Sequence, residues 1–253
     1  MEIPTGRFVW FDYVTHDAKK AQAFFGSLFG WTTQTLAMFR GHYTTIVSGD
    51  RQLGGYMATL PDTPMFRFSE PIARWLPYLQ IANAHDSAVK LKTLGGTMIR
   101  EPYAVADAGK MAIAADPHGE RFALWQPAAV PDDHGWAGPP GTFCWAELYT
   151  SSPSSSVRVL KQLGGFTETK SAMGDGTYHL LERDGAPRAG VRQPMPGMPP
   201  GWFAWVRVAD VDATVAKAKQ LGAEINVPPA DMGASRMALI TDPFGAALGI
   251  MRA

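Results

Sequence analysis

A four-residue turn occurs twice in this chain, about half a chain length apart. Asp116-Pro117-His118-Gly119 and Asp242-Pro243-Phe244-Gly245 are separated by 126 residues (242 − 116), and a short apolar run follows each of them. A repeat at this distance predicts two similar domains. It therefore restricts the fold of the 253 residues more than any other feature of the sequence.

Each half of the chain divides again, into two modules that begin with a strand and continue into a helix. The predicted first strands are short, aromatic and β-branched, and they start at Phe8, Trp75, Phe143 and Phe203. The residues expected to cap the helices are Asp17, Asn83, Ser152 and Asp210. Glycine follows each helix, and hairpin signals or Asp-Pro-x-Gly turns then divide the closing strands.

This strand–helix module, used twice per domain, resembles the vicinal oxygen chelate superfamily, which includes glyoxalase I, bleomycin-resistance proteins and extradiol dioxygenases. The segment from Trp10 to Trp31 is similar to the start of two-domain bacterial glyoxalase-like proteins. The resemblance implies an α+β fold in which four βαβββ modules form two tandem glyoxalase-like domains. The expected boundaries are residues 6–127 (modules 6–61 and 73–127), a linker at 128–140, and residues 141–252 (modules 141–193 and 201–252).

Composition excludes several other classes of protein. Apolar residues make up 46% of the chain, which is too many for a disordered sequence. Lys+Arg and Asp+Glu each number 23, so we expect no nucleic-acid partner. With one cysteine, no signal peptide and no long apolar stretch, we expect a cytoplasmic protein without a membrane partner. The sequence leaves a homodimer open.

The resemblance also implies positions for a divalent metal, on the first and last strands of the modules. In this chain those positions hold Trp10, Leu76, Trp145, Phe203, Ala123 and Gly249. None of these side chains is a ligand for Zn²⁺, Fe²⁺ or Mn²⁺. We therefore expect no metal and no cofactor. Of the histidines, His42 and His179 are expected to face a cavity.

Strand alternation predicts which side chains face away from the helices and line a pocket. The expected ligand-binding residues are Trp10, Tyr78, Gln80, Trp145, Tyr149, Phe203, Trp205 and Arg207. An aromatic lining with a few polar groups is typical of a small-molecule site. Cys144 falls on the opposite face, where we expect a buried small hydrophobe.

Asp12 and Glu147 occupy equivalent positions on this predicted surface. Either carboxylate could be a catalytic base, or an anchor for a cationic or hydroxylated ligand. The alternative is a structural role, in which Glu147 pairs with Arg207 and Asp12 bonds Gln80 or a backbone amide. The tryptophans have a similar alternative, since they could stack on a planar ligand or only fill the volume of a lost metal site.

Two functions follow from these residues. The first is a metal-independent protein whose aromatic cavities bind a small aromatic or carbonyl compound. The second is a glyoxalase- or dioxygenase-type enzyme (a lyase, isomerase or oxidoreductase) with Glu147 or Asp12 as its base. The missing metal donors favour the first.

Overall fold

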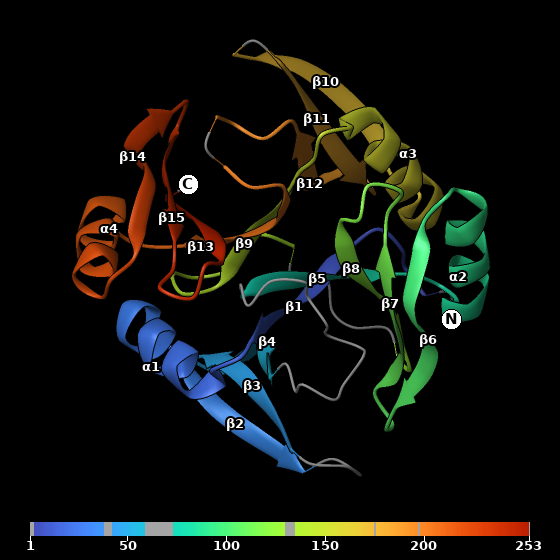
Figure 1. The fold of residues 1–253 in the computed structure, drawn as a ribbon, viewed down its shortest axis with the longest axis horizontal. Coiled ribbons are helices and arrows are strands. Elements are labelled where there is room, and N and C mark those ends of the chain that lie inside the picture. Colours follow the sequence, from blue (N-terminus) through green and yellow to red (C-terminus); the bar gives the residue numbers. More distant parts are fainter. Residues whose placement is uncertain are drawn as a thin grey trace. The chain divides into compact units, whose positions relative to one another are not determined.

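The computed structural model describes residues 3–37, 42–58, 73–129, 135–174, 176–196 and 198–252, which form four βαβββ modules (Figure 1). Module 1 consists of β1 (Phe8–Thr15), α1 (Ala18–Phe29), β2 (Thr32–Ala37), β3 (His42–Ser48) and β4 (Arg51–Ala58). Module 2 consists of β5 (Arg74–Gln80), α2 (Ala84–Thr93), β6 (Thr97–Val105), β7 (Gly109–Ala115) and β8 (Arg121–Pro127). Module 3 consists of β9 (Phe143–Tyr149), α3 (Pro153–Gly164), β10 (Thr167–Met173), β11 (Gly176–Arg183) and β12 (Ala186–Arg192). Module 4 consists of β13 (Gly201–Arg207), α4 (Val211–Gln220), β14 (Glu224–Met232), β15 (Ser235–Thr241) and β16 (Ala247–Arg252).

The described strands form two eight-stranded sheets with the same internal order. One runs β2-β3-β4-β1-β5-β8-β7-β6, and the other runs β10-β11-β12-β9-β13-β16-β15-β14. In every module the first strand pairs in parallel with the last, while the three closing strands form an antiparallel meander. The predicted fold class of two tandem pairs of βαβββ modules is confirmed.

The polar residues at the starts of the helices account for where those helices begin. The side chains of Asp17, Asn83 and Asp210 accept hydrogen bonds from backbone N–H groups in the first turn, as predicted. Ser152 occupies the cap position of α3, but its side chain makes no capping hydrogen bond, so that prediction was wrong in its detail. Pro153 follows at the first helical position, where its fixed φ suits the start of a helix.

The Asp-Pro-x-Gly turns form as predicted and also make a contact that the pattern did not indicate. In each turn the glycine N–H bonds the aspartate C=O, and aspartate Oδ1 accepts two further backbone N–H groups. The second carboxylate oxygen binds a different module. Asp116 accepts a 2.5 Å bond from Ser156, and Asp242 accepts a 2.6 Å bond from Tyr13.

The chain divides into two compact units, each drawing on both halves of the sequence. One contains Met1–Val9, Pro77–Gly135 and Trp145–Trp202, and therefore modules 2 and 3 for the most part. The other contains Trp10–Leu76, Trp136–Cys144 and Phe203–Ala253, and therefore modules 1 and 4. The domain boundaries expected from the sequence stay predictions. The expected end of module 1 at residue 61 and the centre of the linker, 130–134, lie outside the described residues.

Aromatic side chains form the core of the unit built from modules 1 and 4. Tyr13 on β1 packs edge-on against Phe25 of α1 and Trp75 of β5, with ring centroids 5.0 and 4.9 Å apart. Phe143 lies 5.4 Å from both Trp31 and Trp75, and the Trp31 indole N–H donates to the Gly141 carbonyl at 2.7 Å. Buried aromatic rings contribute about 1.5–3 kcal/mol each, so this cluster is a main source of the unit's stability.

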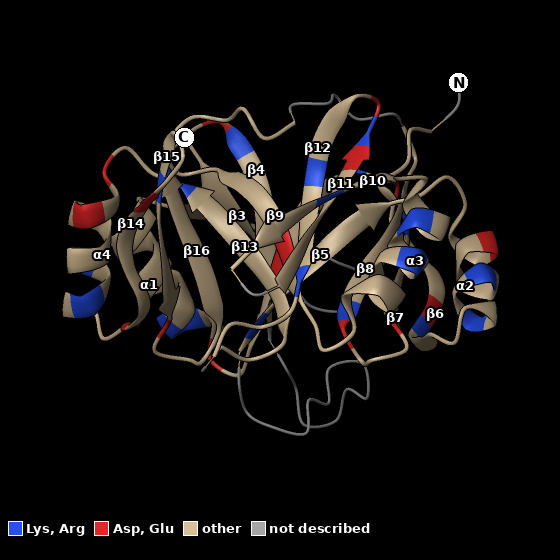
Figure 2. Cartoon of the chain, turned by 90° about the horizontal axis from the view of Figure 1, so that it is seen from above, with Lys and Arg blue, Asp and Glu red and all other residues tan. Residues whose placement is uncertain are grey.

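The unit built from modules 2 and 3 is held by helix contacts and by the Asp116–Ser156 bond. Helices α2 and α3 touch one another (Figure 1). The Phe8 ring packs against the rings of Phe166 and Trp202. Helix α2 has an acidic residue in its first turn and two basic residues in its last, and α4 repeats this charge order (Figure 2). These charges match the helix dipole. No helix of the described residues is long and apolar enough to span a bilayer.

Candidate functional site

Three side chains of module 1 meet on the face of the sheet opposite α1. Trp10 and Asp12 alternate with the core residues Phe11 and Tyr13 along β1, so both point away from the helix. Tyr43 reaches them from β3. The Tyr43 hydroxyl donates to Asp12 at 2.5 Å, and the Trp10 indole N–H lies 3.0 Å from the same carboxylate oxygen and 2.8 Å from the Tyr43 oxygen.

A glycine on the intervening strand β4 makes this meeting possible. Gly55 lies beside Asp12 in the parallel register, and the Tyr43 ring crosses over it. A Cβ at residue 55 would lie 2.1 Å from the Tyr43 hydroxyl oxygen. Only glycine therefore lets the phenol reach the carboxylate on β1.

Module 3 repeats the arrangement with a glutamate. The Trp145 indole N–H donates to the Tyr178 hydroxyl at 3.1 Å, and the Glu147 carboxylate is hydrogen-bonded to that phenol. Gly190 lies beside Glu147 in register, and a Cβ there would lie 1.9 Å from the Tyr178 oxygen. Each of the four residues stands 135 positions after its counterpart, as 145 − 10 and 178 − 43 illustrate. We call Trp10, Asp12, Tyr43 and Gly55 the module 1 tetrad. We call Trp145, Glu147, Tyr178 and Gly190 the module 3 tetrad.

Tyr149 and Arg192 add to the module 3 tetrad. Tyr149 follows Glu147 on the same face of β9 and is hydrogen-bonded to its carboxylate. Arg192 is the register partner of Tyr149 on β12, and its guanidinium carbon lies 5.6 Å from the centroid of the Tyr149 ring. The residues at the corresponding positions of module 1 are Val14 and Met57. The two tetrads therefore differ in the charge beside them.

Burial keeps the phenols of the module 3 tetrad protonated. Desolvation raises the pKa of both Tyr149 and Tyr178 well above the ordinary value, and the nearby Glu147 charge raises both further. At neutral pH each phenol is therefore a hydrogen-bond donor, and Glu147 accepts from both. This arrangement stabilises a buried carboxylate that is only 5% exposed.

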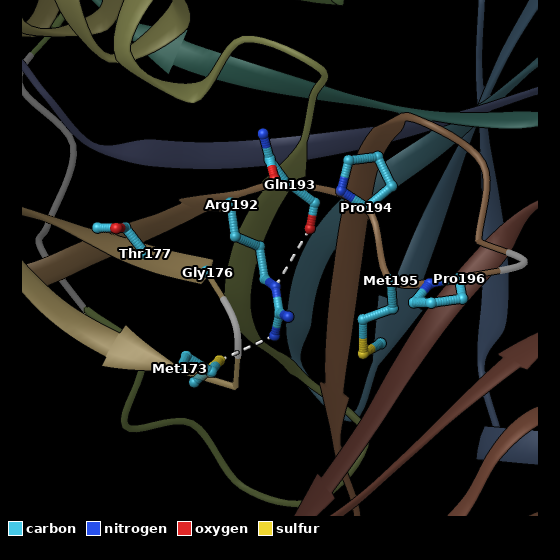
Figure 3. A pocket seen from close by; sticks show the side chains of 8 residues that line it. All are labelled: Met173, Gly176, Thr177, Arg192, Gln193, Pro194, Met195 and Pro196. Atoms are coloured by element: carbon cyan, nitrogen blue, oxygen red, sulfur yellow. Dashed lines mark hydrogen bonds between the residues drawn. The ribbon is translucent and has the colours of Figure 1, made fainter.

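A cavity of about 280 Å³ opens beside Arg192 (Figure 3). Strands β10, β11 and β12 and the segment after β12 line it, with side chains that include Met173, Thr177, Arg192, Gln193, Pro194 and Met195. In Figure 3 the guanidinium extends between Met173 and Gln193, and it donates hydrogen bonds to the Met173 sulfur and the Gln193 carbonyl. The cavity is the size of a small organic ligand.

The remaining residues predicted for ligand binding have partners of their own. The Tyr78 ring lies 6.3 Å from that of Trp125, and Gln80 donates to the Pro4 carbonyl at 2.8 Å. Trp205 and Phe203 are buried on β13. Arg207 donates to the Trp136 carbonyl at 3.1 Å. Glu147 and Arg207 belong to different compact units, so their pairing stays a prediction.

The residues at the superfamily's metal positions do not fit a metal. The Trp205 ring occupies the space above Gly249, where a Cβ would lie 2.1 Å from an indole carbon. The Trp10 indole is a donor to Asp12 and Tyr43, and Leu76 and Ala123 are buried hydrocarbon. Throughout the part of the chain that the structure describes, no three His, Cys, Asp or Glu side chains cluster as metal ligands would.

Some predicted placements hold and one does not. Cys144 is buried, as expected. His179 was expected to face a cavity, but it alternates with Tyr178 on β11 and so lies on the other face. There its Nδ1 lies 2.8 Å from Glu168, which also pairs with Lys161 of α3. Asp12 accepts hydrogen bonds from Trp10 and Tyr43, and the choice between its structural and functional roles stays open.

The structural comparisons define the class of fold. The Mn(II)-bound glyoxalase from Novosphingobium aromaticivorans aligns with a TM-score of 0.64 at 16% identity, covering 98% of this chain and 82% of that one. The 2,3-dioxygenase LapB from Pseudomonas sp. KL28 aligns with a TM-score of 0.67 at 12% identity, covering 100% and 94%. At such low identity these likenesses establish a shared paired-βαβββ fold.

The sequence comparisons agree with this fold. The profile of the Glyoxalase/Bleomycin resistance protein/Dioxygenase superfamily matches residues 145–250. The anthracycline biosynthesis protein DauV of Streptomyces sp. (strain C5) is 29% identical over 259 residues, which cover 97% of this chain and 93% of DauV. The putative glyoxylase CFP32 of Mycobacterium bovis is also 29% identical, over 96% of this chain and 93% of CFP32. Together with the shared fold, these matches support the vicinal oxygen chelate superfamily that the sequence resembles.

Proposed function

We propose that the protein binds a small aromatic compound that carries a hydroxyl or carbonyl group, without using the superfamily's metal. The module 3 tetrad and its cavity are the principal site. The observation that carries this proposal is the repeated set of indole, carboxylate, phenol and glycine, which places a π surface, an acceptor and a donor together in both modules.

Each group of the module 3 tetrad has a role in this proposal. The Trp145 ring offers a surface on which a planar ligand stacks. When the ligand binds, its hydroxyl replaces one phenol as a donor to Glu147, and the O–H of that phenol (Tyr149 or Tyr178) turns to the ligand carbonyl. The names of two relatives support a carbonyl-bearing aromatic ligand, because one is an anthracycline biosynthesis protein and the other a putative glyoxylase.

An enzymatic role is the second candidate, and the contacts of Glu147 favour it. A carboxylate held by two phenols could take a proton from a carbon next to a ligand carbonyl, while one phenol turns its O–H from the carboxylate to the developing oxyanion. Asp12 with Tyr43 offers the same chemistry in module 1.

Isothermal titration of a hydroxyanthraquinone, with Glu147→Gln beside the wild type, tests the proposal. If Glu147 is an anchor, the variant should bind about tenfold more weakly, because a charge-assisted hydrogen bond is lost. If Glu147 is a base, affinity should persist while turnover of the ligand stops. Glu224→Gln, at an exposed position on β14, is the matched control. Failure of the wild type to bind any aromatic hydroxyl or carbonyl compound would overturn the proposal.

Metal analysis tests the metal-free part of the proposal. Protein purified without chelators should carry no stoichiometric Zn, Fe, Mn or Ni, because the expected donor positions hold indoles, hydrocarbon and glycine. A stoichiometric metal that alters ligand affinity would contradict this part and leave the aromatic site to be tested separately.

A further inference from the structure

Arg192 is a cation at the edge of a cavity lined by Met and Pro side chains together with Thr177 and Gln193. Its side chain is half-buried, and its contacts are the Gln193 carbonyl at 3.3 Å, the Met173 sulfur at 2.8 Å and the face of Tyr149 (Figure 3). Among the described residues no carboxylate pairs with it. A guanidinium has five N–H donors, and weak acceptors such as a thioether sulfur satisfy them poorly.

The position of Arg192 connects the cavity to the module 3 tetrad. Arg192 lies two residues after Gly190 on β12, so both residues face the same side of the sheet. Their register partners on β9 are Tyr149 and Glu147. A planar ligand that stacks beside the tetrad would therefore have its other end close to the guanidinium.

We propose that Arg192 binds an anionic group of the ligand, and that the module 3 site takes an aromatic carboxylate. This inference rests on the proposed function and narrows its ligand class. A carboxylate matches the planar fork of a guanidinium and forms two charge-assisted bonds with it. The surrounding Met and Pro side chains lower the local dielectric, which strengthens the pairing.

Module 1 does not share this feature. Met57 and Val14 occupy the positions of Arg192 and Tyr149, so an anion beside the module 1 tetrad would meet no corresponding cation. The preference for an anionic ligand is therefore a property of module 3. Methionine at residue 57 also indicates the best substitution, because Arg192→Met gives module 3 the residue that module 1 carries.

Paired titrations of anthraquinone-2-carboxylate and its methyl ester test the inference. The wild type should bind the acid about ten- to a hundredfold more tightly than the ester. High salt should weaken binding of the acid alone. In Arg192→Met the affinity for the acid should fall to that for the ester, whereas Arg192→Lys should keep part of the preference. Arg158→Met, at an exposed position on α3, should behave like the wild type.

The outcomes separate this inference from the proposed function. Equal binding of acid and ester by the wild type would overturn the role of Arg192 and leave the aromatic site standing. Binding of neither would overturn both. A preference for the acid that survives in Arg192→Met would place the anion elsewhere. Loss of the Tyr149 contact could unfold Arg192→Met, so thermal melting is measured first; if that variant unfolds, salt dependence and Arg192→Lys decide the question.

Discussion

The closest contacts of the candidate sites are made above single glycines. Gly55 and Gly190 lie beneath the phenols of Tyr43 and Tyr178, and the backbone there needs no unusual φ. Glycine is therefore required at these two positions because a larger side chain would not fit, and not because of the backbone conformation. A methyl group at either position would move the tyrosine ring away from the carboxylate and break the tetrad.

Gly190→Ala should disrupt the module 3 tetrad. Its Cβ would meet the Tyr178 oxygen at 1.9 Å, so we expect a loss of about 1–3 kcal/mol in unfolding free energy and weaker ligand binding. Urea unfolding and titration measure the two effects. Gly176→Ala is the control, because its nearest neighbour would be 3.8 Å away. The double variant Tyr178→Ala/Gly190→Ala should be less than additively destabilised, and strict additivity would argue against the clash.

Cys144 should be unreactive while the protein is folded. Burial raises the pKa of its thiol to about 12, although the positive charge of Arg207 acts in the opposite direction. Almost no thiolate is then present at about pH 8, and the thiolate is the reactive form. A disulfide reagent should label the protein only after unfolding in guanidinium. Rapid labelling of the native protein would show that the thiol is more accessible than its position implies.

At the level of single elements, each Asp-Pro-x-Gly turn precedes the last strand of its module and binds a side chain of another module. Burial raises the pKa of Asp242 to about 6, although the Tyr13 hydroxyl and backbone N–H groups favour the charged form. The folded state thus holds this proton more tightly than the unfolded chain, whose ordinary value is 3.8. The resulting stabilisation is complete below about pH 4 and is lost as pH rises through 6.

Asp242→Asn should remove this pH dependence. Asparagine keeps an oxygen for the Phe244 and Ala246 N–H groups, so the turn should persist. The unfolding free energy of the variant, relative to that of the wild type, should rise by up to about 3 kcal/mol as the pH increases from about 4 to about 7. Urea unfolding across this range measures the difference. For Asp212→Asn the unfolding free energy relative to that of the wild type should fall as the pH rises, because Arg236 holds the pKa of the exposed Asp212 below its ordinary value. A difference that is independent of pH for Asp242→Asn would contradict the prediction.

The sequence predicted the elements well and the site only in part. Capping residues, glycine stops and turn dipeptides act locally, so the repeats of Asp17, Asn83 and Asp210 were sufficient to place three helix starts. Trp10, Asp12, Trp145 and Glu147 were found by alternation along a strand. Tyr43 and Tyr178 were missed because they reach the site across an intervening strand. A search at an offset of 135 residues would have paired them.

At the scale of the whole molecule, each compact unit takes a module from each half of the chain. No local signal in the sequence indicates this exchange, because it depends on contacts between residues far apart. The Asp116–Ser156 and Tyr13–Asp242 bonds are two such contacts, with sequence separations of 40 and 229 residues.

The chain should therefore tolerate a break between its halves. When residues 1–132 and 133–253 are produced together, with a tag on one fragment, the other should copurify, because each unit is complete only when both are present. Each fragment alone should unfold at a lower denaturant concentration than the pair. Ser156→Ala and Tyr13→Phe should weaken the association, while Arg158→Met should not. Independent folding of each fragment at full stability would contradict the prediction.

The two tetrads consist of the same kinds of residue, an indole, a carboxylate, a phenol and a glycine, but among the described residues a cation takes the position beside the module 3 tetrad that Met57 takes in module 1. This gives the molecule a form of redundancy within a single gene product. A substitution that abolishes one site leaves a second copy of the same chemistry in place. If both tetrads bind ligands as proposed, the copy beside Arg192 is free to specialise for one ligand while the module 1 copy preserves a general affinity for flat molecules, so one chain can acquire a new binding preference without first losing the old one.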